Sequence, residues 1–160
     1  CDWSSDVCSS DLLARRNAHN ADAALSTTLA NMLMEPGHFR KEADVGFRFL
    51  VLSHTLLSYL SGLGAHRETQ LPAEVREHLI EGAAASLAAS IDEIAQSLAN
   101  KKPVAIQSDA EEALASDLEH MPDDMDESQR LVQTQLALIG RQLGPLRTLA
   151  AHLIKEPTEA

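Results

Sequence analysis

The sequence contains few aromatic residues and little basic charge. Aromatic side chains make up 3% of its 160 residues, although 44% of the residues are hydrophobic. A core must therefore be built from aliphatic residues, and the abundance of Ala and Leu, which are strong helix formers, predicts an all-α fold. There are 13 Lys and Arg against 24 Asp and Glu, so the formal net charge is −11. A chain of this charge repels phosphate backbones, which argues against nucleic acid as a partner.

Cysteine and tryptophan are confined to the first twelve residues, CDWSSDVCSSDL. Neither a disulfide nor a metal site is indicated there, because no His or further Cys stands at ligand spacing. The run shows no helical or strand periodicity and lacks the basic and apolar regions of a signal peptide. It resembles the translation of a common short-read sequencing adapter. We therefore interpret residues 1–12 as an artefactual adapter-derived segment, and expect that the native sequence preceding Leu13 is missing.

Apolar residues recur at helical spacing in five segments, which are separated by breaks containing Pro, Gly or Asn. The predicted helices are residues 13–34, 39–62, 72–100, 108–121 and 126–155. Four long helices and one short acidic helix with short connections predict an antiparallel helical bundle. We expect a single domain over residues 13–156, followed by a frayed tail at 157–160.

Three of these segments carry a clear apolar stripe. In the first it comprises Ala18, Ala21, Leu25, Leu29 and Met32. In the third it comprises Ile80, Ala84, Leu87, Ile91, Ile94 and Leu98. In the last it comprises Val132, Leu136, Ile139, Leu143, Leu146, Ala150 and Leu153. Gly144-Pro145 interrupts this last stripe and predicts a kink, because proline lacks an N–H and crowds the carbonyl of Arg141.

The segment 39–62 is apolar on nearly all sides, so it is either a central bundle helix or a membrane-spanning helix. Its polar residues favour the bundle helix: Arg48, Ser53, His54, Thr55, Ser58 and Ser61. His54 stands among apolar neighbours at helical spacing. We interpret it as a core histidine bonded to Ser58 rather than as a metal ligand.

The stretch from Ser108 to Gln129 contains nine acidic residues and no Lys or Arg. It begins with Ser108-Asp109-Ala110-Glu111, which fits a capping box. A solvated helix face and loop is the simpler interpretation of the acids, and a site for a cation or a basic partner is the alternative. The spacing of a calcium loop is missing.

No pattern in the sequence indicates catalysis or a cofactor. A nucleophile elbow and a phosphate-binding glycine loop are both missing. The two carboxylate–histidine pairs, Glu35-x-x-His38 and Asp117-x-x-His120, have no matching partner of the kind that a helical di-iron site needs. We therefore expect no enzyme activity and no metal. An enzyme or metal protein using His54 or the acidic stretch is the least favoured hypothesis.

One polar constellation has a defined shape. At spacings of three and four residues, polar side chains follow one edge of the first apolar stripe, and neighbouring basic and amide groups extend it. The candidate docking edge comprises Arg15, Arg16, His19, Asn20, Asp22 and Ser26. It would face a membrane-proximal partner. The simpler alternative is a ladder of helix-surface pairs worth a few tenths of a kcal/mol each.

The run RRNAHNADAALSTTLANMLMEP, followed by FRFLVLSHTLLSYLSGLGAHR, resembles the C-terminal cytoplasmic region of YccS/YhfK-type inner-membrane proteins. These belong to the fusaric-acid-resistance (FUSC) superfamily. The resemblance is strongest over Arg15–Arg67. It implies a bacterial inner-membrane protein, regarded as an efflux permease for aromatic acids and similar compounds, with this domain facing the cytoplasm. It provides no catalytic residues to transfer.

Two hypotheses about function follow. In the first, the chain is the C-terminal cytoplasmic domain fragment of such a transporter, with an assembly or regulatory role and no chemistry of its own. Its partner would be the missing transmembrane part of the same protein. In the second, the chain is a free-standing soluble bundle that acts as an interaction or dimerisation module, forming a homo-oligomer through its helical faces.

Overall fold

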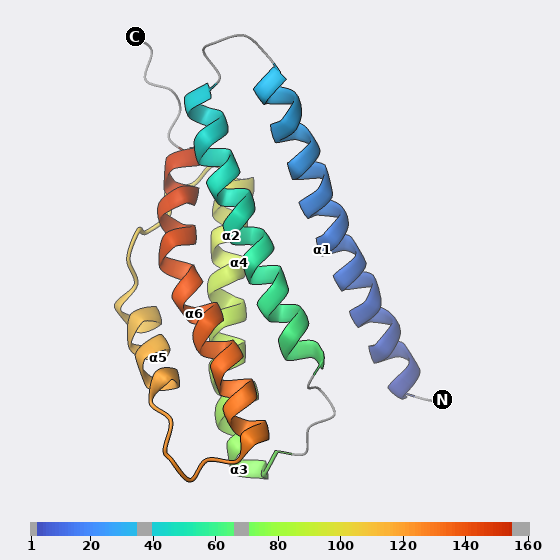
Figure 1. Cartoon of the computed structure of the whole chain (residues 1–160), viewed down its shortest axis with the longest axis vertical. Helices are drawn as coiled ribbons and strands as arrows, with labels where there is room; N and C mark the ends of the chain where they lie inside the picture. Colours follow the sequence, from blue (N-terminus) through green and yellow to red (C-terminus); the bar gives the residue numbers. More distant parts are fainter. Residues whose placement is uncertain (1–2, 35–39, 66–70, 155–160) are drawn as a thin grey trace. The chain divides into compact units, whose positions relative to one another are not determined.

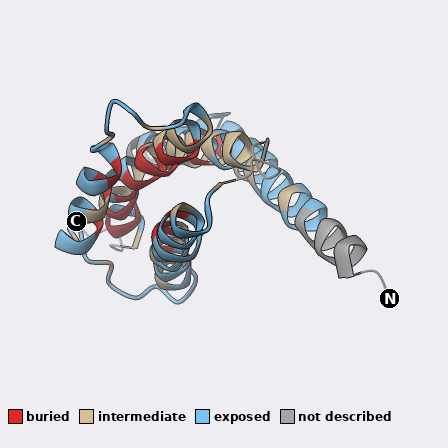
Figure 2. Cartoon of the chain, turned by 90° about the horizontal axis from the view of Figure 1, so that it is seen from below, coloured by how far each residue is buried: buried red, intermediate tan, exposed pale blue. Residues whose placement is uncertain are grey.

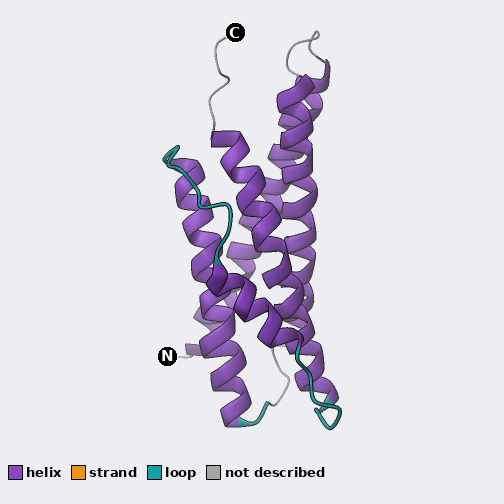
Figure 3. Cartoon of the chain, turned by 90° about the vertical axis from the view of Figure 1, so that its left-hand side faces the viewer, coloured by secondary structure: helices purple, strands orange, loops and turns teal. Residues whose placement is uncertain are grey.

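The computed structural model describes residues 3–34, 40–65 and 71–154, with side chains over residues 12–34, 44–64 and 71–154. The described residues form helices and loops without any strand, which confirms the all-α class (Figure 3). Contacts gather into two compact units, Cys1–Leu57 and Ser58–Ala160. In chain order the helices are α1 (Trp3–Met34), α2 (Arg40–Ala65), α3 (Ala73–Arg76), the π-helical η1 (Glu77–Ala84), α4 (Ala85–Ala99), α5 (Asp109–Glu119) and α6 (Glu127–Ile154) (Figure 1).

Some expectations fall on residues that are not described. These are the break at residues 35–37, the start of the second helix at residue 39, the pair Glu35-x-x-His38, and the tail at 157–160. The single domain over 13–156 and the adapter origin of residues 1–12 also stay predictions.

Helix α1 begins at Trp3, ten residues before the predicted start. Periodicity missed these residues, because a helix can also extend through residues that have no apolar stripe. None of residues 3–12 is Pro or Gly, and each residue added to an existing helix gains a backbone hydrogen bond without a new nucleation cost.

The apolar stripe of α1 is buried only toward its C-terminal end. Leu29 is buried and Leu25 and Met32 are half-buried, as expected, whereas Ala18 and Ala21 are exposed. Along its described length most of α1 is exposed (Figure 2).

Helix α2 is not buried on all sides. Leu56 is buried, but Phe47 and Val51 expose 52% and 50% of their surface. The prediction of a central helix enclosed by neighbours is therefore wrong for these residues, because hydrophobicity shows which residues can be buried and not which ones have neighbours. Within the described stretches, none of the helices combines the length and the apolar run that a membrane crossing needs.

A glycine allows α1 and α2 to approach each other within the first unit. Gly46 is buried, and a Cβ atom added there would lie 2.6 Å from Cδ2 of Leu29, which is itself buried. A contact this short cannot persist, so one of the two side chains would have to move. Gly46 therefore leaves room for the end of the Leu29 side chain.

We expect Gly46→Ala to destabilise the chain by roughly 1 kcal/mol, because the overlap with Leu29 outweighs the better helix propensity of alanine. Urea unfolding followed by circular dichroism measures the change. In a Leu29→Ala background the overlap is removed, so there the same substitution should be neutral or stabilising. Gly46→Ala that is as stable as the parent in the normal background would contradict this explanation.

In the second unit, α4 and α6 run in the same direction and α5 runs opposite to both (Figure 1). The predicted helix 72–100 forms with Pro72 preceding it and Ala99 ending it, but its early part is π-helical. A π-helix has more residues per turn than an α-helix, and this changes which residues face inward. Leu79 and Ala83 are buried, whereas the predicted stripe residue Ile80 is 40% exposed.

Helix α6 supplies most of the core. Six of the seven predicted stripe residues are buried, and they are Val132, Leu136, Ile139, Leu143, Leu146 and Ala150. Leu153, the seventh, is 42% exposed, so its predicted burial is wrong. Periodicity defines a face of the helix, whereas burial also requires a neighbouring element at the same level. Helix α6 continues through Gly144 and Pro145, and the predicted kink stays a prediction.

Helix α5 begins at the predicted N-cap, while the Glu111 carboxylate, which a capping box would turn back to Ser108, bonds Arg147. Ser108 is the N-cap, and its Oγ accepts a hydrogen bond from the backbone N–H of Glu111 at 3.4 Å. Close packing then seats α5 on α6, because a Cβ atom added to Gly140 would lie 3.2 Å from Cβ of Ala115. The short acidic helix is thus part of the packed second unit.

Candidate functional site

The structure places the whole docking edge on α1, within the first unit. Arg16, His19, Asn20 and Ser26 are exposed, and Arg15 and Asp22 are half-buried. The edge is therefore accessible through four of its six members. Its role in docking stays a prediction.

Asp22 contacts His54 of α2. Its Oδ2 lies 3.1 Å from Nδ1 of His54, while its Oδ1 is buried and has no hydrogen-bond partner. The His54 side chain is 68% exposed, so its prediction as a core histidine is wrong. His54 lies on the α2 face that also carries the exposed Phe47 and Val51, spaced four and three residues apart. The Asp22–His54 pair therefore joins α1 to α2 and takes Asp22 out of the accessible edge.

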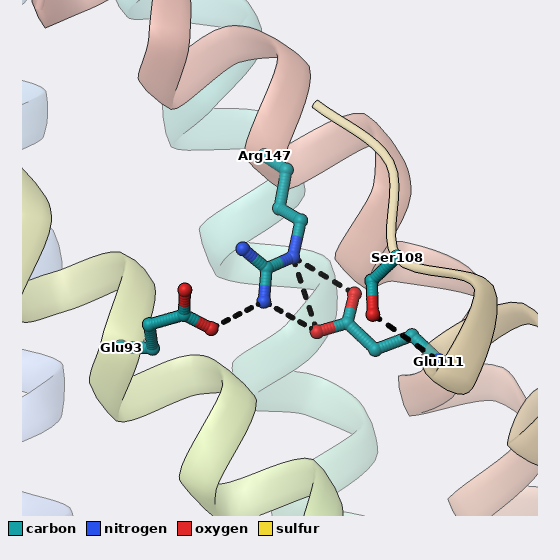
Figure 4. A network of polar contacts seen from close by, with 4 residues as sticks. All are labelled: Glu93, Ser108, Glu111 and Arg147. Carbon is teal, nitrogen blue, oxygen red and sulfur yellow. Dashed lines mark hydrogen bonds and ion pairs between the residues drawn. The ribbon is translucent and has the colours of Figure 1, made fainter. Parts of the chain in front are cut away.

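A second polar cluster, which the sequence did not predict, lies in the second unit (Figure 4). Arg147 of α6 is directed at Glu111 of α5 and Glu93 of α4. Its Nε donates to the Glu111 carboxylate at 2.9 and 3.1 Å, and its Nη2 donates to Glu111 at 2.6 Å and to Glu93 at 2.7 Å. One guanidinium thus connects three helices, and we call these residues the Arg147 cluster.

The three members of the Arg147 cluster differ in exposure. The side chains of Arg147 and Glu111 are 3% and 10% exposed, while that of Glu93 is 60% exposed. Burial alone would raise the pKa of Glu111, but hydrogen bonds from Arg147 and Ser90 and the charge of Arg147 outweigh it and hold the pKa below 4.5. The hydrogen bonds that Arg147 donates to Glu111 likewise raise the pKa of Arg147 against its desolvation. Both groups therefore stay charged over the neutral pH range.

The lowered pKa of Glu111 predicts an acid-sensitive contribution to stability. A carboxyl whose pKa is lower in the folded than in the unfolded state stabilises the fold above its unfolded value, and this contribution is lost as the pH falls through the folded pKa. We expect the parent chain to lose more stability than Glu111→Gln when the pH falls from about 7 to about 3. Urea midpoints at both pH values measure this, with the exposed Glu81→Gln as control. Equal losses in the parent and in Glu111→Gln would contradict the assignment.

Arg141 of α6 forms a second, more exposed set of ion pairs with carboxylates of α5. Its Nε and Nη2 each donate to the Glu119 carboxylate at 2.6 Å, and its Nη1 donates to Glu112. These hydrogen bonds lower the pKa of Glu119 and raise that of Arg141. The interpretation of the α5 acids as a solvated face is therefore wrong for Glu111, which is buried, and three of these acids pair with arginines of the same chain.

A buried amide completes the attachment of α5. Gln133 of α6 is 6% exposed, and its Nε2 donates to the carbonyl oxygens of Leu118 at 2.9 Å and His120 at 3.3 Å. Carbonyls at the end of a helix have no partner within the helix, so this amide satisfies the carbonyl of the buried Leu118, which would otherwise be unpaired, and also bonds that of the exposed His120. Helix α5 is thus fixed at its start by Glu111 and at its end by Gln133.

The polar contacts of Arg147, Arg141 and Gln133 hold helices α4, α5 and α6 in position. The carboxylates nearest to Arg147 and Arg141 are held in ion pairs with these arginines. Over the described ranges, no group of three or more His, Cys, Asp or Glu side chains is placed to hold a metal ion. The docking edge contains two guanidinium groups, of which that of Arg16 belongs to an exposed residue, and several hydrogen-bonding groups.

Comparison with known proteins finds relatives for part of the chain. No family model matches it, and no solved structure is significantly similar. The inner membrane protein YccS of Escherichia coli (strain K12) is 50% identical over 56 residues. An uncharacterized protein of Haemophilus influenzae (strain ATCC 51907 / DSM 11121 / KW20 / Rd) is 54% identical over 56 residues. The matched stretch is 35% of this chain and 8% of each relative, so a third of the chain has a YccS-like sequence.

Proposed function

We propose that this chain is a segment of a YccS-type inner-membrane protein of the FUSC superfamily. In this proposal it forms a C-terminal helical domain on the cytoplasmic side. The domain serves assembly or regulation of the whole protein and performs no chemistry of its own. The observation that carries the proposal is the 50% identity over 56 residues to a protein named as an inner membrane protein.

The charge pattern of α1 supports a cytoplasmic position near the membrane. Arg15 and Arg16 are adjacent, and the chain as a whole carries a net charge of −11. Cytoplasmic segments close to membrane helices are enriched in Lys and Arg. The docking edge would then contact the transmembrane part of the same protein, which in FUSC-type proteins is regarded as the efflux pathway.

The coding DNA upstream of Leu13 in the source genome tests this proposal directly. We expect the reading frame to continue upstream and to encode several segments of about 20 apolar residues, each long enough to span a bilayer. A frame that opens shortly before Leu13, or that continues without such segments, would overturn the proposal.

Co-purification tests the docking role. The upstream part of the full-length protein and a separate tagged segment of residues 13–160 would be expressed together in bacterial membranes. We expect the two parts to purify together, and Arg16→Glu to abolish this by reversing an exposed charge of the docking edge. The matched control is Arg48→Glu, which alters an arginine of α2 that is 69% exposed and pairs with Asp44. Equal effects of both substitutions would argue against a specific docking edge.

The exposed apolar residues of α2 favour a second candidate, a self-associating module. Phe47 and Val51 lie one turn apart and are each about half exposed (52% and 50%). Light scattering of the purified chain tests this candidate, and Phe47→Ser should shift any oligomer toward monomer. A strictly monomeric parent chain would remove it.

A further inference from the structure

A groove of about 460 Å³ lies in the second unit, beside the Arg147 cluster. The loop before α5, the first turn of α5 and one face of α6 form its walls. We call it the Gly144 groove, and its lining includes Ile106, Ser108, Asp109, Arg141, Gly144 and Thr148. Its volume is within the range of sites that bind small molecules or single side chains.

Gly144 lines the groove, and packing within the chain does not explain why this residue is a glycine. Gly140 and Gly144 are one turn apart on α6. A Cβ atom added to Gly140 would press on Ala115, whereas one added to Gly144 would meet no atom within 4 Å. Glycine inside a helix costs roughly 1 kcal/mol relative to alanine, and Pro145 adds a further cost in the same turn. Gly144 is exposed, so its backbone is open to the close approach of another molecule.

The lining of the groove offers hydrogen-bond acceptors and negative charge. Asp109 brings an exposed carboxylate, whereas the Glu112 carboxylate is paired with the guanidinium of Arg141, which Glu119 also holds. Because Pro145 has no N–H, the Arg141 carbonyl has lost its normal partner in the helix. Apolar surface is also present, since Ile106 is 50% exposed. Anions are disfavoured here, and a cation carried on an apolar stem is favoured.

We propose that the Gly144 groove binds an alkylammonium or alkylguanidinium group. The apolar stem lies over Gly144 and against Ile106, and the cationic end faces Asp109. This chemistry belongs both to free alkylamines and to a Lys or Arg side chain of another polypeptide. The inference concerns a site of the second unit and does not depend on the proposed function.

Backbone amide NMR of the full chain measures the binding. The probes are butylamine, butanol and butyrate, which share the stem and differ in charge. A second arm uses an acetylated and amidated pentapeptide, Ala-Ala-Lys-Ala-Ala, and its counterpart with glutamine at the centre. We expect saturable shifts at Gly140, Gly144 and Thr148 with butylamine, with the lysine peptide, or with both. If only butylamine binds, the ligand is a free amine. If only the lysine peptide binds, the ligand is a side chain of another polypeptide.

Two substitutions and one control make the test specific. Gly144→Leu fills the groove and should abolish the shifts, and Asp109→Asn should weaken binding about three- to tenfold, as expected for loss of a partly exposed charge pair. Asp123→Asn, in the exposed loop after α5, should leave binding unchanged. Thermal melting confirms that each variant folds. Equal shifts with butyrate, no saturable binding of either cation, or unchanged binding in both Gly144→Leu and Asp109→Asn would overturn the proposal.

Discussion

Arg147→Met is expected to destabilise the chain by about 3–4 kcal/mol, which is among the largest effects of any single substitution in the described structure. The substitution leaves Glu111 buried beside an apolar side chain with its ionic partner gone. Taking an unpaired carboxylate out of water costs several kcal/mol, and the group reduces that cost only by taking up a proton. Urea unfolding at neutral pH measures the loss. The variant should also become relatively more stable as the pH falls toward 5, because protonation then relieves the unpaired charge.

The double variant Arg147→Met/Glu111→Leu shows whether Arg147→Met destabilises the chain because Glu111 is left as an unpaired buried charge or because the contact between α5 and α6 is lost. Replacing both partners of a buried ion pair by apolar residues is often neutral or stabilising. We therefore expect the double variant to recover most of the stability that the single variant loses. Arg141→Met is the matched control, and its effect should be smaller, because its ion pairs are exposed and screened by water. A double variant no more stable than Arg147→Met would show that Arg147 acts through packing of its stem.

Leu143→Ala is expected to cost about 3 kcal/mol. Leu143 is 0% exposed at the middle of α6, and truncating it leaves a cavity between α6 and its neighbours. For a chain of this size the loss corresponds to a fall in melting temperature of roughly 10 °C. Thermal unfolding followed by circular dichroism measures it.

Leu153→Ala provides the comparison for Leu143→Ala, because it removes the same atoms from the same stripe. Leu153 is 42% exposed, and its truncation should cost less than about 1 kcal/mol. Similar losses for the two leucines would mean that the C-terminal end of α6 is covered by something other than the described residues.

The periodicity of apolar residues predicted the helices and one face of α6 correctly. The sequence determines these features because helix propensity, capping and the spacing of Leu, Ile and Ala are local properties. The Ser108 cap and the start of α5 at Asp109 are examples. The predictions failed where the answer depended on which element lies opposite. Leu153 has the right spacing and is still exposed, whereas Ile80 is exposed because the π-helical geometry of η1 changes which residues face inward.

The polar contacts that position the helices were decided by the tertiary structure. Arg147 follows Leu146 on the apolar side of α6, and Gln133 follows Val132 in the same way. A polar residue next to a stripe position was the one available signal that these groups are buried. Their partners could not be predicted, since Glu111 lies 36 residues and Glu93 lies 54 residues from Arg147.

The sequence by itself determined an acidic, helical chain with a YccS-like stretch and a strong apolar face on its last helix. Only the tertiary structure decided that three acidic residues of α5 are bound by arginines of α6, that Asp22 pairs with His54, and that Gly144 faces an open groove. The physical reason is that the period of a helix is set by its own backbone. Charge pairing and burial are set by neighbours that the chain brings together from distant positions.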